Sequence, residues 1–213
     1  MNLFESNNSI PDSPSFYWEH LLKEKNYSII AGVDEAGRGP LSGPVIAAAV
    51  IITGEVEFLN ELNDSKKINE KQRAIIYKKI ISERNIIFGI GGASALEIDR
   101  LNILQATFLA FKRAVFSLRI QPVALLIDGN RAPYFNNIFT QTVIKGDQLS
   151  YSIAAASIIA KETRDMIMCN LSERYPEYEW NKNKGYPTKR HKELIKKFGI
   201  SKHHRLSFKG VIK

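Results

Sequence analysis

The sequence predicts an α/β fold, and three observations carry that prediction. Apolar runs at 28–33 and 45–52 are rich in β-branched side chains, which is typical of buried strands. A run at 123–127 is apolar without alternation, as in a strand that is covered on both faces. The segment 102–119 has the apolar spacing of a helix, and 150–175 fits a long helix. Strands followed by alternating helices and strands indicate an α/β sheet.

The first half of the chain is expected to contain two helices and three strands. Residues 1–14 are polar, include two prolines and are predicted to form a loose leader. In chain order we predict a helix over 16–25, strands over 28–33 and 45–52, a polar loop over 61–67, a helix from its cap Asn69 to Ser82, and a strand over 85–93. The last strand is glycine-rich, so we expect a bulge in it.

The second half is expected to alternate helices with strands. In order, we predict a helix over 102–119, strands over 123–127 and 140–144, a long helix over 150–175, a loop bracketed by Pro176 and Pro187, and a last helix from Thr188 through Lys197 that ends at Gly199. We therefore divide the chain into a leader and short helix, 1–27, and one domain, 28–213.

Positive charge is concentrated at the C-terminal end. The formal net charge is +8, and residues 178–213 contain eleven Lys or Arg against two acids, which leaves −1 for residues 1–177. Such an end is the electrostatic footprint of a protein that binds a polyanion. Trp180, Tyr186 and Phe198 within it indicate packing rather than a free, solvated tail.

The remaining bulk features favour the cytoplasm. Cys169 is the single cysteine, so an internal disulfide is excluded, and its apolar neighbours predict a buried helix residue. The first residues lack the basic and then apolar layout of a signal peptide. No apolar run approaches the length of a membrane span. We expect a cytoplasmic monomer with no membrane association.

The turn at 31–44 is the segment that points to chemistry. It joins two predicted strands and carries the adjacent acids Asp34 and Glu35, followed by Gly37-Arg38-Gly39. Buried carboxylates are costly unless a positive charge lies beside them. Glycines allow a close backbone approach, and arginine suits phosphate. Acids for a metal next to such a turn indicate phosphoester chemistry on a nucleic acid.

Two further acids follow predicted strands. Asp128 and Asp147 would join Asp34 and Glu35 in one crevice at the strand ends of the sheet. Four carboxylates would repel one another, and oxygen ligands favour Mg²⁺ or Mn²⁺ over Zn²⁺. Asp34 and Glu35 pose a geometric problem, because neighbours on a strand point to opposite faces. Both serve one site only if the strand ends there.

Several ordered motifs closely resemble those of bacterial ribonuclease HII, from about Ile30 to about Phe208. They are AGVDEAGRGPLSGPVIAAAV, NDSKK at 63–67, LLIDGN at 125–130, KGD at 145–147, SIAAASIIAKETRD at 152–165 and KGYPT at 184–188. The resemblance implies a ribonuclease-H-like fold, with a mixed five-stranded sheet flanked by helices and a helical C-terminal part. It makes 28–213 the catalytic domain, with 178–213 as its basic segment.

The same resemblance implies an activity. The family cuts RNA–DNA hybrids and duplex DNA with embedded ribonucleotides on the 5′ side of a ribonucleotide, leaving a 3′-hydroxyl and a 5′-phosphate. This would serve DNA replication and repair by removing misincorporated ribonucleotides. Asp34, Glu35, Asp128 and Asp147 would hold two metal ions, one activating a water and the other stabilising the leaving 3′ oxygen.

Substrate contacts also carry over from the family. Backbone groups of Gly37, Arg38 and Gly39 would contact the 2′-hydroxyl, and Tyr186 would pack on the next deoxyribose. A loop with Ser65, Lys66 and Lys67 would reach the substrate backbone. The basic neighbours of Tyr186 that suit phosphates are Lys182, Lys184, Lys189 and Arg190.

Other polar residues are predicted to be structural. Lys161 is expected to be structural or to make a minor contact. Glu162 stands where an apolar residue is expected, at some risk to packing, and Asp165 is expected to pair with Arg164 or lie at the surface. The histidines lack a fourth zinc ligand, so we expect phosphate contacts or surface positions for His191, His203 and His204.

Two other functions remain open at this point. One is a non-catalytic nucleic-acid-binding module, which the set of four acids disfavours, because acids weaken phosphate binding without metal. The other is a resolvase or transposase of the same fold, which the Gly37-Arg38-Gly39 turn and the Tyr186 motif disfavour.

Overall fold

The computed structural model describes residues 11–64 and 69–211, and its centre is a five-stranded mixed sheet. The strands are β1 (Ile30–Ala36), β2 (Val45–Ile52), β3 (Ile86–Ala93), β4 (Ala124–Asp128) and β5 (Phe139–Val143), in the spatial order β3-β2-β1-β4-β5. β1, β2 and β3 pair antiparallel, whereas β4 and β5 run parallel to β1. The predicted α/β class is confirmed.

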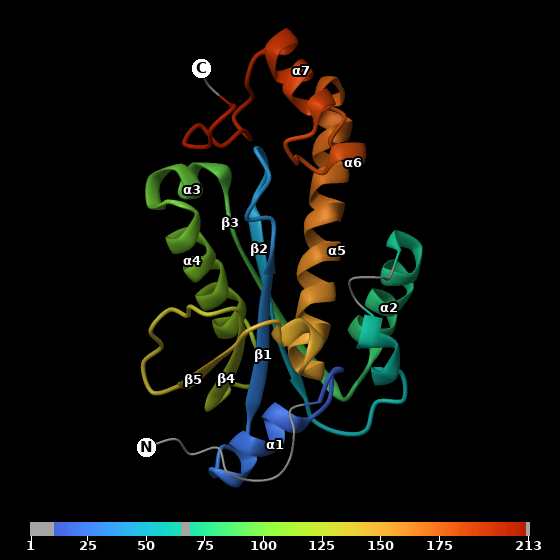
Figure 1. Ribbon diagram of the computed structural model, residues 1–213, viewed down its shortest axis with the longest axis vertical. Coiled ribbons are helices and arrows are strands. Elements are labelled where there is room, and N and C mark those ends of the chain that lie inside the picture. Colours follow the sequence, from blue (N-terminus) through green and yellow to red (C-terminus); the bar gives the residue numbers. More distant parts are fainter. Residues whose placement is uncertain (1–10, 65–68, 212–213) are drawn as a thin grey trace.

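Helices cover both faces of this sheet (Figure 1). They are α1 (Tyr17–Glu24), α2 (Glu70–Ser82), α3 (Ala95–Leu101), α4 (Ile103–Phe116), α5 (Tyr151–Arg174), α6 (Trp180–Asn183) and α7 (Lys189–Phe198), with short 3₁₀ turns at Leu59–Asp64, Gly146–Gln148 and Pro176–Tyr178. α4 packs on β2 and β3 from one side, and α5 packs on β1 and β2 from the other. α1 lies at the end of the molecule opposite to α6 and α7 (Figure 1).

Alternation along β1 divides the core into two layers. Ala31 and Val33 point toward α4, where they meet buried residues such as Phe111. On the other face, Ala48 and Val50 of β2 join the α5 residues in a second cluster. A strand that is apolar on both faces lies between two helical layers, and β1 is accordingly the middle strand of the sheet.

Most predicted helix starts are confirmed by their caps. The Asn69 side chain accepts from Gln72 N–H in a capping box that begins α2. The side chains of Ser150 and Thr188 cap α5 and α7 by accepting the N–H groups of Ile153 and His191. Asn102 caps α4 through the N–H groups of Leu104 and Gln105. Each cap satisfies backbone donors that the first helical turn leaves unpaired.

Three predicted features differ from the structure. The bulge expected over 85–93 is wrong, because β3 pairs with β2 residue for residue along its whole length. Its glycines serve packing instead: a Cβ on Gly89 or Gly91 would lie within about 2.5 Å of α4 backbone oxygens. Helix α3 was not expected. The loop between Pro176 and Pro187 contains a 3₁₀ turn and α6.

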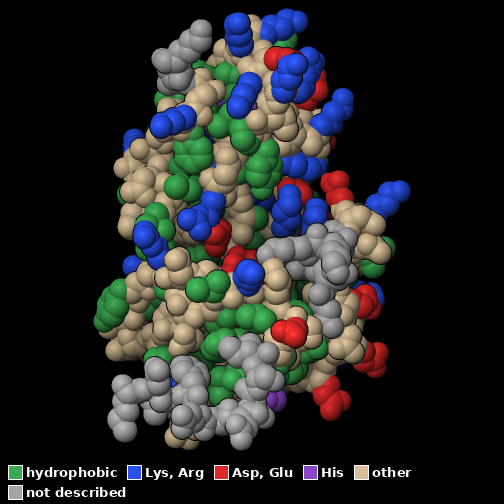
Figure 2. All heavy atoms as spheres, viewed as in Figure 1, with side chains coloured by type: hydrophobic (Ala, Val, Ile, Leu, Met, Phe, Trp, Pro, Cys, Tyr) green, Lys and Arg blue, Asp and Glu red, His purple; other side chains and the backbone are tan. Residues whose placement is uncertain are grey.

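The C-terminal segment folds back over the loop that joins β1 to β2. Leu41 N–H donates to Gly185, Gly43 N–H to His203, and Arg205 N–H to Leu41. Lys and Arg side chains gather over α6 and α7 on the face that Figure 2 shows. This segment is therefore part of the domain and not an appended tail. Within the described residues, no helix is long and apolar enough to cross a membrane.

Candidate active site at the carboxyl ends of β1 and β4

The four predicted acids lie in one neighbourhood. β1 and β4 are adjacent and parallel, with Val33 opposite Ile127, so the next residues, Asp34 and Asp128, come side by side. Asp147 lies in the 3₁₀ turn before α5, and its charge acts on Asp128. The Asp128 carboxylate accepts the Gly146 N–H at 2.6 Å, which ties this turn to the end of β4. The carboxyl ends of parallel strands thus share a crevice.

Asp34 and Glu35 do point to opposite faces. The Asp34 carboxylate accepts from the hydroxyl of Ser157 on α5, whereas Glu35 lines a pocket of about 50 Å³ with α4 residues and Asp128. β1 does not end at these acids but runs on to Ala36. Asp128, at the last position of β4, adjoins both of them, because its charge acts on Asp34 and on Glu35. Asp128 therefore links the two sides of the site.

Crowding of the carboxyls alters their acidity. Burial raises the pKa of Asp34 well above its usual value, and the charges of Glu35 and Asp128 raise it further. Burial also raises the pKa of Glu35, which Arg38 opposes through an ion pair of 3.2 Å. The pKa of Asp128 is raised by burial and by Asp147, against hydrogen bonds from Gly146 and neighbouring amides. Among the described residues, Arg38 is the cation that opposes this shift at Glu35, and no cation contributes to the shifts of Asp34 and Asp128.

This donor set fits a hard divalent cation. All side-chain donors are oxygens, which suit Mg²⁺ or Mn²⁺, and their mutual repulsion is the kind that a cation relieves. In the parts of the chain that the structure describes, no three acidic, histidine or cysteine side chains are already gathered as a metal site. Glu35 is instead held by Arg38, and Asp128 by the Gly146 amide.

The Gly37-Arg38-Gly39 turn follows directly on β1, and its two glycines have different environments. Gly37 has φ +98°, and a Cβ there would lie 2.1 Å from Nε of Arg164. A Cβ on Gly39 would meet only the ring of Tyr186, at 4.0 Å. Gly37 is thus required by the fold, whereas Gly39 borders an open surface beside Tyr186.

Two buried arginines, whose roles the sequence does not predict, hold the loop between β1 and β2 that begins with this turn. Arg164 of α5 donates to the carbonyls of Ser42, Pro44 and Lys184. Arg205 of the C-terminal segment donates to four carbonyls, those of Gly37, Arg38, Gly43 and Pro44. Both side chains are fully buried. No sequence signal marks such residues, because every residue offers a carbonyl.

Tyr186 is half-exposed and lies over Arg164, whose guanidinium carbon is 5.7 Å from the ring centroid. Its backbone carbonyl bonds to Nδ1 of His191, and Nε2 of His191 accepts from the Trp180 indole at 3.1 Å. Since the indole only donates, His191 must carry its proton on Nδ1. Trp180 and His191 therefore hold the backbone of Tyr186.

The predicted surface positions of two histidines are wrong. His191 and His204 are 0% and 2% exposed, and they pack with Trp180 and Tyr178 in an aromatic cluster. Burial, with the charge of His191 adding, lowers the pKa of His204 to about 4. His203 is half-buried against Tyr175. The Trp180 ring packs against all three histidine rings, and this packing keeps His191 and His204 in the interior.

The basic neighbours of Tyr186 are not equivalent. Lys184 is mostly buried and donates to Cys169 and to Asn181, and Arg190 pairs with Glu179. Lys182 lies 4.0 Å from the same glutamate, whereas Lys189 is exposed at the start of α7. Lys184 is thus a structural residue, and Cys169 is half-buried rather than buried.

The polar residues in the middle of α5 form an ion-pair network. Asp165 is bonded by Lys161 and by Arg73 of α2, not by Arg164. Arg73 also pairs with Glu162. The Glu162 carboxylate, a risk to packing on sequence grounds, therefore helps to join α2 to α5. The predicted contacts Ser65, Lys66 and Lys67 lie outside the described residues.

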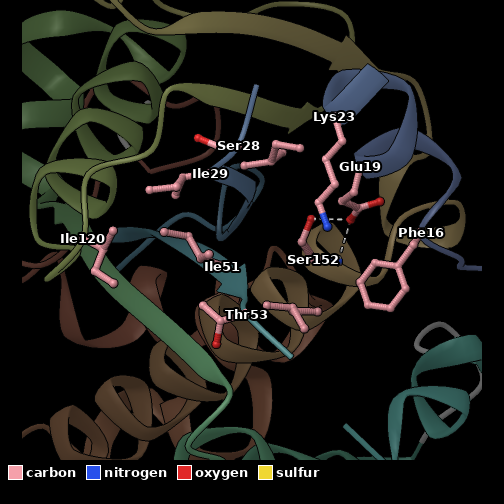
Figure 3. Close-up of a pocket in the computed structure, with 11 residues that line it drawn as sticks. Phe16, Glu19, Lys23, Ser28, Ile29, Ile51, Thr53, Ile120 and Ser152 are labelled. Atoms are coloured by element: carbon pink, nitrogen blue, oxygen red, sulfur yellow. Dashed lines mark hydrogen bonds between the residues drawn. The ribbon is translucent and has the colours of Figure 1, made fainter. Parts of the chain in front are cut away.

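A second hollow, of about 210 Å³, lies at the opposite end of β1 (Figure 3). Glu19 of α1 points into the space above the start of α5, where Oε1 accepts from Ser152 N–H and from the hydroxyls of Ser150 and Ser152. These bonds satisfy the first turn of α5. The bonds of Glu19 thus join α1 to α5, at the end of β1 away from the four acids.

Comparison with known proteins gives a consistent picture. A sequence model of the family described as ribonuclease HII matches residues 31–211. The curated ribonuclease HII of Wolbachia sp. subsp. Brugia malayi (strain TRS) is 48% identical over 196 residues, which cover 92% of this chain and 95% of that protein.

Solved structures are similar as well. Ribonuclease H2 from Pyrococcus horikoshii OT3 matches with a TM-score of 0.72 and 29% identity, covering 86% of this chain and 95% of that one. Bst ribonuclease HIII in complex with Mn²⁺ matches with a TM-score of 0.67 and 18% identity, covering 97% and 74%. At that identity the second likeness concerns the fold alone.

Proposed function

Because this chain belongs to the ribonuclease HII family, whose members are endonucleases of RNA–DNA hybrids, we propose that it cuts the phosphodiester bond on the 5′ side of a ribonucleotide. The centre would be formed by Asp34, Glu35, Asp128 and Asp147. The observation that carries the proposal is the gathering of Asp34, Glu35 and Asp128 on two adjacent strands, with Asp147 acting on Asp128, next to an exposed turn and the ring of Tyr186.

The residues around the acids would each contact a different part of the substrate. The amides of the Gly37-Arg38-Gly39 turn would receive the ribose 2′-hydroxyl and its phosphate, since the Gly39 side of the turn is open. The ring of Tyr186 would pack on the next sugar. Exposed lysines of α7, such as Lys189 and Lys192, would contact phosphates further along the duplex.

The acids would hold the divalent cation, Mn²⁺ or Mg²⁺. Bound there, it would supply positive charge to the phosphate and lower the pKa of an attacking water. Asp34 is oriented for this by Ser157, and Asp128 by the Gly146 amide. Arg38 pairs with one carboxylate oxygen of Glu35, Oε1, and so balances part of its charge.

The assignment of the fourth acid can be tested with two matched variants. Asp147 lies beside Asp128, whereas Asp165 is bonded by Lys161 and Arg73. We expect Asp147→Asn to lose at least about a hundredfold in rate, as when a group that stabilises the transition state is removed. Asp165→Asn should keep most activity. The measurement is cleavage of a DNA duplex with one ribonucleotide, with circular dichroism as a control for folding.

The metal dependence of the same assay separates the other functions. Cleavage only with Mg²⁺ or Mn²⁺, and not with EDTA, supports the proposal. Binding without cleavage would identify a non-catalytic module, and cleavage of the all-DNA duplex would identify another nuclease of this fold. A folded, inactive Asp165→Asn beside an active Asp147→Asn would overturn the assignment of the acids.

A further inference from the structure

Arg205 is a buried cation with an unusual set of partners. Its side chain is 0% exposed, and its four hydrogen bonds, of 2.6–3.1 Å, all go to backbone carbonyls of residues 37–44. The ion pairs among the described residues do not include it. A buried charge without an ion-pair partner is costly. The carbonyls of this loop therefore compensate the charge of Arg205, and their hydrogen bonds fix the loop.

The bonds to Gly37 and Arg38 determine where the amides of the turn point. The peptide bonds here are trans, so the N–H of each peptide unit points away from its C=O. Arg205 draws the carbonyls of Gly37 and Arg38 into the protein. The next N–H groups, those of Arg38 and Gly39, are therefore directed outward, at residues that are exposed.

Two successive outward N–H groups offer adjacent donors to an oxygen that carries negative charge or lone pairs. This site lies beside Tyr186, because a Cβ on Gly39 would be 4.0 Å from its ring. It also follows the strand of Asp34 and Glu35 directly along the chain. Its amides are thus placed between the acids and the position proposed for the next sugar.

We propose that Arg205 is the positioning residue for ribose selectivity: it aims the Arg38 and Gly39 amides at the 2′-hydroxyl of the ribonucleotide. This rests on the function proposed above. Arginine is required because its planar group offers five donors, which reach four carbonyls at once, whereas the lysine ammonium is a compact point charge with three. Asp99 of α3 supports the arrangement by accepting from Leu206 and Ser207, the residues that follow Arg205.

The experiment compares binding to two duplexes that differ in one oxygen atom. One carries a single ribonucleotide, and the other is all DNA. Affinities are measured with Mg²⁺ in an Asp128→Asn background, so that neither is cut. We expect Arg205→Lys to lower the preference for the ribonucleotide duplex by about fivefold or more, the factor of one ordinary hydrogen bond. Its affinity for the all-DNA duplex should change less than about twofold.

Arg164→Lys is the matched control. Arg164 is equally buried and also donates to carbonyls, but not to those of Gly37 or Arg38. It should lower the thermal midpoint as Arg205→Lys does. Arg164 also lies under the Tyr186 ring, but that ring would pack on a deoxyribose that both duplexes contain, so the preference between them should stay intact. A merely structural role of Arg205 predicts the same preference in both variants, and that result would overturn the proposal.

A second variant decides the matter if Arg205→Lys does not fold. Asp99 lies on a surface helix, and Asp99→Ala frees the backbone after Arg205 without removing a buried charge. A reduced preference in this variant supports the proposal, and an unchanged preference in the folded variant refutes it. If the parent protein itself does not distinguish the duplexes, the proposed function fails rather than the role of Arg205.

Discussion

In the turn after β1, one glycine is required for folding and the other is expected to matter for function. Gly37 has a positive φ and no room for a Cβ, whereas Gly39 has room. We expect Gly37→Ala to lower the thermal midpoint, and Gly39→Val to leave it within about 2 °C while reducing cleavage at least about tenfold, because the valine would stand where the ribose approaches. Thermal melts and cleavage rates of both variants test this. Full activity in a stable Gly39→Val would remove this face of the turn from the mechanism.

The acids themselves are predicted to destabilise the protein when no metal is bound. The pKa of Asp34 is raised in the folded state, so its protonated form is favoured there, and the associated stability is lost as pH rises through that pKa. At pH 7 with EDTA, Asp34→Asn should therefore raise the thermal midpoint by about 2 °C or more, the effect of about 1 kcal/mol in a chain of this size. Activity with metal should fall at least about a hundredfold. A lowered midpoint in the folded variant would contradict the crowding argument.

The sequence predicts that the acids lie at one edge of the sheet, but it does not predict the roles of Arg164 and Arg205. The reason is physical. Asp34 and Asp128 each follow an apolar run, so a strand prediction brings them to one edge of the sheet. Arg164 and Arg205 are bonded to carbonyls more than a hundred positions away. A carbonyl has no sequence identity, so such a partnership appears only once the chain is folded.

At the scale of elements, the same glycines allowed two interpretations. A glycine in a strand favours either a bulge or close packing, and only the position of α4 above Gly89 and Gly91 decides between them. Helix α3 did have a sequence signal, because Ser94 and Glu97 form a capping box. A box that precedes only seven helical residues is easily overlooked beside the longer α4.

The aromatic cluster beneath α7 should make the protein sensitive to acid. Burial lowers the pKa of His204 to about 4, below its unfolded value near 6.5. The stability from a depressed pKa is present above about pH 6.5 and is lost as pH falls toward about 4. Between pH 7 and pH 5 the thermal midpoint of the parent should fall at least about 3 °C more than that of His204→Asn, whose amide can still accept the Ser201 N–H.

His191 is the neighbour to consider in that measurement, because its pKa is also lowered by burial and its ring lies 5.5 Å from that of His204. The acids near Asp34 have the opposite pH dependence, but they are present in both the parent and His204→Asn. Their contribution therefore cancels when the two curves of thermal midpoint against pH are subtracted. Parallel curves for parent and variant would show that His204 does not titrate with folding.

At the scale of the whole molecule, charge and packing are combined in the C-terminal segment. Trp180, His191 and Arg205 are fully buried, so removing residues 178–213 would unfold the turn and would not report on charge alone. The exposed lysines of α7 can be changed instead, because the buried side of this helix is formed by His191, Leu194 and Ile195. A surface charge change of this kind leaves the fold intact.

The final prediction concerns the salt dependence of duplex binding. Lys189 and Lys192 are exposed on α7, and Lys23 and Lys25 are exposed at the α1 end of the molecule (Figure 1). Each lost phosphate contact lowers the slope of log affinity against log salt by about 0.9. We expect Lys189→Gln with Lys192→Gln to weaken binding of the all-DNA and the ribonucleotide duplex equally and to reduce the slope by about 1–2. The matched pair Lys23→Gln with Lys25→Gln removes the same net charge far from the acids and should leave the slope within about 0.3. Equal slopes for both pairs would mean that net charge, and not a footprint on α7, attracts the duplex.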